Sequence, residues 1–184
     1  MKWTVHGRRS IYTSPWIELW LDDVEVPGAG RFEHHVVRMR PTVTAVVFDN
    51  AAEHVLLLWR HRFIPDVWGW EVPGGWVDGD EASSEAIRRE VEEETGWQPG
   101  PMTELGSWFN MPGISDVQCT LYRADGATLV GDPQDESEST QVDWVPVRDI
   151  PRLIADRQIT DGDTLIALSF ALAAAPPRTP RPAR

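Results

Sequence analysis

The sequence is poor in cysteine and lysine. Cys119 is its only cysteine, so an internal disulfide is impossible and a reducing compartment fits. We expect Cys119 to be a small buried side chain in a strand. Lys2 is the only lysine among 17 basic residues, which face 29 acidic ones and leave a formal net charge of −12. A broad nucleic-acid interface needs a basic surface, so the charge argues against nucleic-acid binding.

Long hydrophobic runs are also missing. The longest, Leu165–Ala175, is too short to span a bilayer and is interpreted as a packed helix. Arg8 and Arg9 are not followed by the apolar segment of an export signal. We therefore expect a cytoplasmic protein without membrane contact. The 184 residues, 41% of them hydrophobic, suffice for one domain with a substantial core.

The sequence does contain one dense motif, GWVDGDEASSEAIRREVEEETGW, at residues 75–97. Residues 82–95 within it include no glycine or proline, and Gly96 follows where a left-handed C-cap residue belongs. The motif therefore predicts a helix that is entered from a glycine-rich loop. Its candidate N-cap residues are Asp78, Asp80 and Ser83.

Three glutamates of this helix share one side. At about 100° per residue, Glu90, Glu93 and Glu94 fall on one arc. Like charges at this spacing destabilise an isolated helix by about 0.2–0.5 kcal/mol per pair, so a bound cation is the natural compensation. Ligands that are all oxygen favour Mg²⁺ or Mn²⁺ over zinc. The alternative is a merely solvated acidic face, which is how we interpret Glu85 and Glu92.

The spacing of the motif resembles the signature of the Nudix hydrolases. That signature is G-x5-E-x7-R-E-U-x-E-E-x-G-U, where U is a bulky apolar residue, and residues 75–97 match every specified position. Trp97 is the one soft match, because an aliphatic residue is more usual there. The preceding WGWEVPGG, residues 68–75, resembles the segment that leads into the motif in this family. Glu71 within it is either a contact near the metal or a strand glutamate with an arginine partner.

The resemblance implies a metal site on this helix. It assigns Glu90 and Glu94 as direct ligands, Glu93 as a third ligand or a holder of water, and the carbonyl of Gly74 as a ligand from the loop. The residues that it implies in orienting these carboxylates are Arg89 and Glu81.

The resemblance also implies a general base from a later loop. In related enzymes a glutamate at this point accepts the proton of the attacking water. Glu136 and Glu138, in the polar segment 132–139, are both candidates, and the sequence does not decide between them. A solvated acidic loop is the plainer interpretation of most of this segment.

Basic and aromatic residues outside the motif are candidates for substrate binding. Arg60 and Arg62 end an apolar run and suit a diphosphate, with Arg62 favoured, although ordinary surface arginines are the alternative. Arg40 is a weaker candidate, and Trp16 either stacks on a base or fills an interface. Pro112 stands sixteen residues after the last glycine of the motif, which is a marker of the ADP-ribose pyrophosphatase branch but also an ordinary Pro-Gly turn.

The order of elements predicts an α/β fold. Residues 1–40 are expected to form an N-terminal antiparallel β appendage, a hairpin of strands 16–26 and 31–39. Residues 41–175 are expected to form the Nudix α/β/α sandwich around a mixed β-sheet, and residues 176–184 a disordered tail. The resemblance to ADP-ribose pyrophosphatases implies that the appendage mediates a homodimer. Further strands are expected at 42–48, 55–62, 105–109, 117–124 and 142–147, and helices at 151–157 and 164–174, the last with Asp161 and Asp163 among its cap candidates.

The implied function is metal-dependent hydrolysis of a nucleoside diphosphate derivative, with ADP-ribose cleaved to AMP and ribose 5-phosphate as the first expectation. A nucleotide sugar or another dinucleotide is the alternative within the family, since the metal site contacts only the diphosphate. A non-catalytic ADP-ribose sensor is the alternative from another class. Such proteins usually carry a degraded motif or an added DNA-binding domain, and the sequence shows neither.

Overall fold

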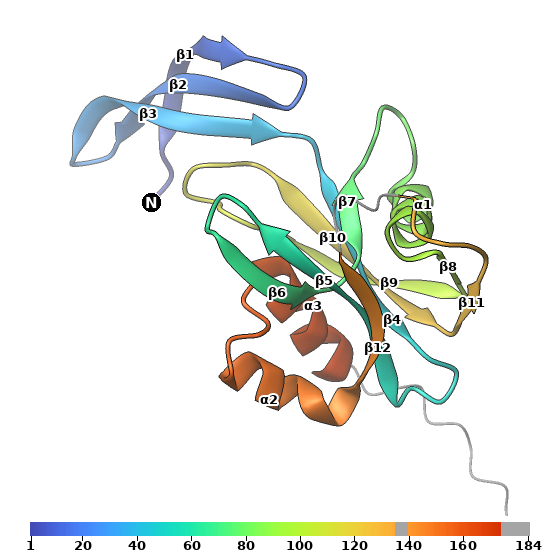
Figure 1. Cartoon of the computed structure of the whole chain (residues 1–184). Coiled ribbons are helices and arrows are strands. Elements are labelled where there is room, and N and C mark those ends of the chain that lie inside the picture. Colours follow the sequence, from blue (N-terminus) through green and yellow to red (C-terminus); the bar gives the residue numbers. More distant parts are fainter. Residues whose placement is uncertain (135–139, 174–184) are drawn as a thin grey trace, which may run out of the picture.

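A three-stranded antiparallel sheet and a seven-stranded mixed sheet organise the molecule (Figure 1). The computed structural model describes residues 1–134 and 140–173, so the predicted tail lies outside the described residues. Within those ranges, none of the helices has the length and apolar composition needed to cross a bilayer. The elements in chain order are β1 (Thr4–Thr13), β2 (Ile17–Val26), β3 (Gly30–Met39), β4 (Thr42–Phe48), β5 (His54–Arg62), β6 (Val67–Glu71), β7 (Gly74–Trp76), α1 (Ser83–Thr95), β8 (Trp97–Pro99), β9 (Met102–Phe109), β10 (Gln118–Asp125), β11 (Ala127–Leu129), β12 (Gln141–Pro146), a 3₁₀ turn (Val147–Asp149), α2 (Ile150–Ala155) and α3 (Gly162–Ala173).

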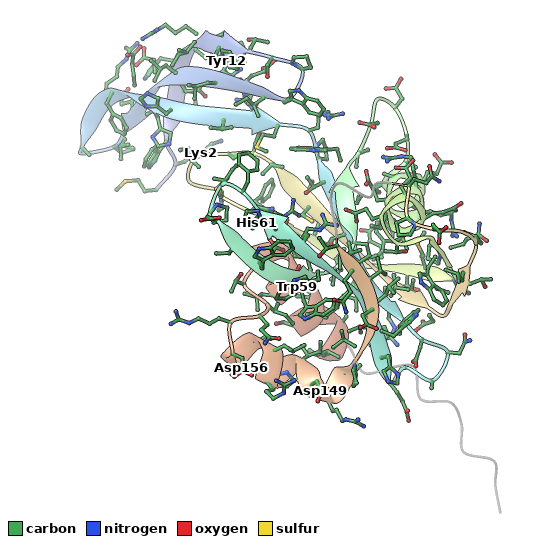
Figure 2. All side chains as sticks on the ribbon, viewed as in Figure 1. Lys2, Tyr12, Trp59, His61, Asp149 and Asp156 are labelled. Atoms are coloured by element: carbon green, nitrogen blue, oxygen red, sulfur yellow. The ribbon has the colours of Figure 1, made fainter. Side chains whose placement is uncertain are left out.

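The N-terminal sheet has the order β1-β2-β3 and is antiparallel throughout. The antiparallel appendage is thus confirmed, but it has one strand more than the predicted hairpin. None of the residues of β1 is buried, and Figure 2 shows Tyr12 on the outer side of this sheet. β1 was missed because a strand without a buried face has no alternation of apolar and polar residues to reveal it.

The central sheet has the order β12-β5-β4-β10-β9, with β6 paired to β5 and β7 paired to β4. β10 runs parallel to β4, from Cys119 opposite Thr42 to Asp125 opposite Phe48, and the other pairs are antiparallel. β4 and β5 lie at its centre because their residues are apolar on both faces. Cys119 is buried in β10, as predicted.

Helices cover both faces of the central sheet, which confirms the predicted α/β/α sandwich. Because side chains alternate along a strand, β4 contributes to two separate cores. Ala45 and Val47 pack with α1, whereas Val46 and Phe48 pack with α2 and α3. Figure 1 shows α1 on one side of the sheet and α2 and α3 on the other. The helical residues of the two cores are Ala86, Ile87 and Val91 on one face and Ile150, Leu153, Ala167, Leu168 and Ala171 on the other.

The two ends of α1 differ in how well the sequence predicted them. Gly96 ends the helix with φ of 72°, the left-handed conformation expected of its C-cap. The N-cap, however, is Ala82, and none of the three predicted candidates holds that position. Ser83 is instead the first helical residue, and its hydroxyl is hydrogen bonded to the hydroxyl of Tyr122 at 2.7 Å. The N–H of Ala82 donates to the side chain of Glu85 at 3.3 Å, which stabilises this end without a side-chain cap.

Candidate active site

A pocket of about 690 Å³ opens beside α1. Its walls come from the end of the N-terminal sheet, from strands β4 to β7, from α1 and from the start of α3. Segments from the first, middle and last parts of the described chain therefore meet at one place. Most of the side chains that line it are charged or aromatic, which is the composition of a site for a polar ligand.

Arg89 is the hub of the α1 side of this pocket. It donates hydrogen bonds to Glu81 at 2.9 Å, to Glu90 at 2.8 Å and to Glu93 at 3.0 Å. A further bond of 3.1 Å to the carbonyl of Trp76 ties the helix to β7. The hydrogen bond that Arg89 donates to Glu81, followed by those to Glu90 and Glu93, holds the pKa of Arg89 above its usual range. The structure thus brings the predicted orienting pair, Arg89 and Glu81, together with two of the three arc glutamates.

Glu94, the third arc glutamate, lies beneath the pocket with an exposed fraction of 3%. Its Oε1 accepts a hydrogen bond of 2.6 Å from Arg60, and its Oε2 accepts one of 2.9 Å from the backbone N–H of Gly74. Burial raises the pKa of Glu94 to about 7, although the charge and hydrogen bond of Arg60 oppose this shift. A buried carboxylate of this kind is stabilised by any additional cation that reaches it.

The glycines before α1 allow the backbone to approach these carboxylates. A Cβ atom at Gly75 would lie 2.3 Å from Cδ of Glu90, and one at Gly74 would lie 2.4 Å from the carbonyl oxygen of Val43. Real Cβ contacts are essentially never this short, so a side chain at Gly74 would clash with backbone, and one at Gly75 would force the carboxylate of Glu90 to move. The start of β7 therefore presents its backbone, rather than side chains, to Glu90.

The proposed metal ligands are carboxylate and carbonyl oxygens, which are the ligands that a hard divalent ion prefers. As placed, no three His, Cys, Asp or Glu side chains in residues 1–134 and 140–173 form a cluster that could hold a metal. Arg89 contacts Glu90 and Glu93, while Arg60 contacts Glu94. Metal binding here thus requires these carboxylates to turn from their arginine partners.

The two predicted diphosphate-binding arginines of β5 both line the pocket. Arg62 donates to Glu71 at 2.6 Å and has a side chain that is 52% exposed. Arg60 is buried between Glu94 and Glu71, at 2.6 Å and 3.8 Å. Glu71 therefore has the arginine partners that one alternative requires, and it also lines the pocket. Arg62 is the better placed of the two arginines to reach a ligand, because its side chain is half exposed.

Arg40 and Trp16 bring the N-terminal sheet to the same pocket. The guanidinium of Arg40 lies 5.3 Å from the ring centres of both Trp16 and Trp76, within the range of cation–π attraction. It also forms an ion pair with Asp78. Trp16 is 63% exposed, so one face of its ring remains accessible to a ligand.

Three predicted site residues of the described structure, Glu81, Glu94 and Pro112, do not line the pocket. Glu81 and Glu94 are hydrogen bonded to arginines that do line it. Pro112 is exposed and does not line it, because its loop turns toward β3, where Val37 donates its N–H to the carbonyl of Ile114 at 2.8 Å. Glu136 and Glu138, the candidates for the general base, lie outside the described residues.

The pocket also contains two aspartates that the sequence suggested only as helix caps. Asp161 caps α3 through the N–H of Thr164 at 2.8 Å, and both Asp161 and Asp163 line the pocket. Asp163 accepts hydrogen bonds from Trp108 at 3.1 Å and from Asn110 at 2.9 Å. Burial, followed by the charge of Asp161, raises the pKa of Asp163. The capping pattern marked these residues, but only the tertiary fold places them opposite α1.

Comparison with known proteins gives evidence on the family that is independent of this geometry. A model of the NUDIX domain family matches residues 38–165, which include the central sheet and α1. The chain belongs to the Nudix family. The predicted family, and an enzyme of the pyrophosphohydrolase type, are thereby confirmed. Nudix hydrolases generally depend on divalent metals and act on small nucleotide substrates.

Individual Nudix relatives are similar to this chain over most of its length. A CMP-5'-(N-acetyl-N-hydroxy-3-aminopropyl)phosphonate hydrolase of Streptomyces rubellomurinus is 36% identical over 94% of this chain and 83% of its own. An ADP-ribose pyrophosphatase of Bacillus subtilis is 24% identical over 89% of each chain. The crystal structure of an ADP compounds hydrolase superposes with a TM-score of 0.78 over 94% of each chain at 20% identity, which shows the shared fold.

Proposed function

We propose that this Nudix enzyme uses Mg²⁺ or Mn²⁺ to hydrolyse the diphosphate of a nucleoside diphosphate derivative, and that it cleaves ADP-ribose to AMP and ribose 5-phosphate. The observation that carries the proposal is the convergence of Glu90 and Glu93 of α1, the two glycines of β7 and Arg62 on one pocket. The similarity to an ADP-ribose pyrophosphatase over 89% of the chain supports the choice of substrate.

In this proposal Glu90, Glu93, Glu94 and the carbonyl of Gly74 would hold the metal. Such an ion would supply positive charge to stabilise the transition state and would lower the pKa of water. Arg89 and Glu81 orient the carboxylates through the hydrogen bonds described above.

The remaining residues are assigned to the two ends of the substrate. Arg62, with Arg60 behind it, contacts the diphosphate, because guanidinium groups match phosphate oxygens in geometry and charge. Trp16 and Arg40 contact the base, for which the exposed ring of Trp16 offers a flat apolar surface. Glu136 or Glu138 accepts the proton of the attacking water.

A second candidate substrate follows from the phosphonate hydrolase of S. rubellomurinus. That relative is 36% identical over 94% of this chain, whereas the ADP-ribose pyrophosphatase is 24% identical. A CMP-linked phosphonate presents the same P–O–P linkage to the metal and differs in the base and in the second half. The catalytic residues proposed above would therefore serve either substrate. They would also serve a nucleotide sugar.

We also propose that residues 1–40 mediate a homodimer and that the protein is cytoplasmic. The N-terminal region exposes the apolar side chains of Trp3, just before β1, and of Val5, Ile11 and Phe32 in the sheet, which supports an interface there. Light scattering coupled to size-exclusion chromatography measures the mass in solution, and a monomer would contradict the dimer.

The substrate is tested by product analysis. We expect AMP and ribose 5-phosphate from ADP-ribose with Mg²⁺, and no product with EDTA. Parallel reactions use a CMP-linked phosphonate, GDP-mannose, ADP-glucose, NADH and a diadenosine polyphosphate. Preferential cleavage of one of these compounds would make it the substrate in place of ADP-ribose and would leave the proposed hydrolysis of a diphosphate unchanged. If the folded protein cleaves none of them, the result would favour the ADP-ribose sensor.

A further inference from the structure

The loop between β9 and β10, residues 110–116, is attached to the N-terminal sheet. Val37 of β3 donates its N–H to the carbonyl of Ile114 at 2.8 Å. The ring of His34 is hydrogen bonded to the carbonyl of Gly113 at 2.9 Å. Figure 1 shows this loop reaching out from the central sheet to β3. The 110–116 loop thus attaches the central sheet to the N-terminal sheet, in addition to the chain connection between β3 and β4.

An ion pair completes this attachment. Arg38 of β3 pairs with Asp116 of the 110–116 loop and lies 4.0 Å from Asp22 of β2. Asp22 is 5% exposed and lies closer to Arg8, at 3.6 Å, than to Arg38. Asp116 is therefore the main partner of Arg38, and Asp22 is a second and more distant acidic neighbour.

The end of the sheet that is fixed in this way carries Trp16 and Arg40. Arg40 follows Arg38 by two residues, directly after the end of β3, and Met39 is paired with Ile17, the neighbour of Trp16. The guanidinium of Arg40 lies 5.3 Å from the ring centre of Trp16. A shift of β3 at Arg38 would therefore move both pocket residues together.

The same loop also reaches the opposite wall of the pocket. The amide of Asn110 donates hydrogen bonds of 2.9 Å to both carboxylate oxygens of Asp163. Asp163 lines the pocket, as do Trp16 and Arg40. One loop thus sets the position of two walls that come from opposite ends of the described chain.

We infer that Asp116 is a positioning residue for substrate binding: through Arg38 it holds Trp16 and Arg40 against the pocket. The inference rests on the proposed function, in which those two residues contact the substrate. Asp116 does not line the pocket, so its loss affects the binding of substrate and leaves the chemical step unchanged.

The test compares Asp116→Asn with a matched control. Asp23→Asn also removes an aspartate that pairs with an arginine, Arg31, but this pair lies within the N-terminal sheet. We expect Asp116→Asn to raise KM for ADP-ribose by about three- to fivefold with kcat unchanged, the size of effect that a half-exposed ion pair supports. Asp116→Glu should restore KM, and Asp23→Asn should leave it unchanged.

A double-mutant cycle shows whether Asp116 acts through Trp16. In a Trp16→Ala background, Asp116→Asn should raise KM by a smaller factor than it does alone, because one of the two residues that it positions is gone. Hydrogen exchange at the amide of Val37 gives a readout apart from activity, and we expect faster exchange in Asp116→Asn but not in Asp23→Asn.

Three results would overturn the inference: an unchanged KM in Asp116→Asn, an equal effect with and without Trp16, or unchanged exchange at Val37. The first two require an active wild type, the third does not, and all three leave the proposed function intact. A wild-type protein that cleaves no diphosphate substrate would instead overturn the proposed function, and the inference with it.

Discussion

The backbone N–H of Gly74 donates a hydrogen bond of 2.9 Å to Oε2 of Glu94. This bond fixes the start of β7 to α1 across twenty residues of sequence. The other oxygen of the same carboxylate pairs with Arg60 of β5, so one buried side chain joins β7, α1 and β5. The geometry of the proposed metal site therefore depends on Glu94 both for a ligand and for the position of its neighbours.

Glu94→Gln should lower turnover by at least about 100-fold, because it replaces a proposed metal ligand by a neutral amide. It preserves volume, so the fold should persist. The buried guanidinium of Arg60 loses a charged partner, and we expect the free energy of unfolding to fall by about 1–3 kcal/mol. Kinetics with Mg²⁺ and urea unfolding measure the two effects. A variant with near-normal kcat would refute the ligand assignment.

Arg89→Lys should weaken metal binding more than it changes the maximal rate. Lysine keeps the charge but lacks the planar fork that contacts Glu81, Glu90 and Glu93 together. We expect the Mg²⁺ concentration for half-maximal activity to rise by about 10- to 100-fold, as is usual when groups that orient metal ligands are lost. Arg88→Lys, on the same helix, is the control. Equal Mg²⁺ dependence of both variants would contradict the role of Arg89.

Gly75→Ala should disable the site through one added methyl group. Its Cβ would lie 2.3 Å from Cδ of Glu90, so the carboxylate or the loop must move. A displacement of about 1 Å at a reacting centre can lower the rate by about 100-fold, and we expect a loss of that order. The control is Gly7→Ala, where no atom lies within 4 Å of the added Cβ. Normal activity in Gly75→Ala would show that the close contact with Glu90 is unimportant.

Asp163→Asn should change how stability depends on pH. Burial raises the pKa of Asp163 above its ordinary value of 3.8, so the folded protein binds this proton more tightly than the unfolded chain does. The resulting contribution to stability is complete below that ordinary value and is lost as the pH rises through the folded pKa. Relative to the wild type, the variant should therefore gain stability as the pH rises from 3.8 through the folded pKa. Urea unfolding measures this, with exposed Asp156→Asn as the control. A difference that is constant with pH would contradict the shifted pKa.

The sequence predicted α1 and its glutamate arc because both depend on local spacing. A helix of 3.6 residues per turn brings Glu90, Glu93 and Glu94 to one side whatever surrounds it. The layers of the fold were equally accessible, since apolar runs such as β4 can be stable only between two helical layers.

Contacts between residues far apart in the sequence could not be predicted from the spacing of residues along the chain. The pairs of Arg60 with Glu94 and of Arg62 with Glu71 depend on how β5, β6 and α1 pack, and Asp161 and Asp163 reach the pocket from the last helix. Pro112 matched a family marker by its distance from the motif, yet distance along the chain does not determine which way a loop turns. The described loop turns toward the N-terminal sheet.

The most direct test of the central claim compares two glutamates on α1. Glu93 lines the pocket and Glu92, its neighbour, does not. We expect Mg²⁺-dependent release of AMP from ADP-ribose to fall by at least about 100-fold in Glu93→Gln and to stay within about twofold of the wild type in Glu92→Gln. Equal activity of the two variants would contradict a metal site on this side of the helix.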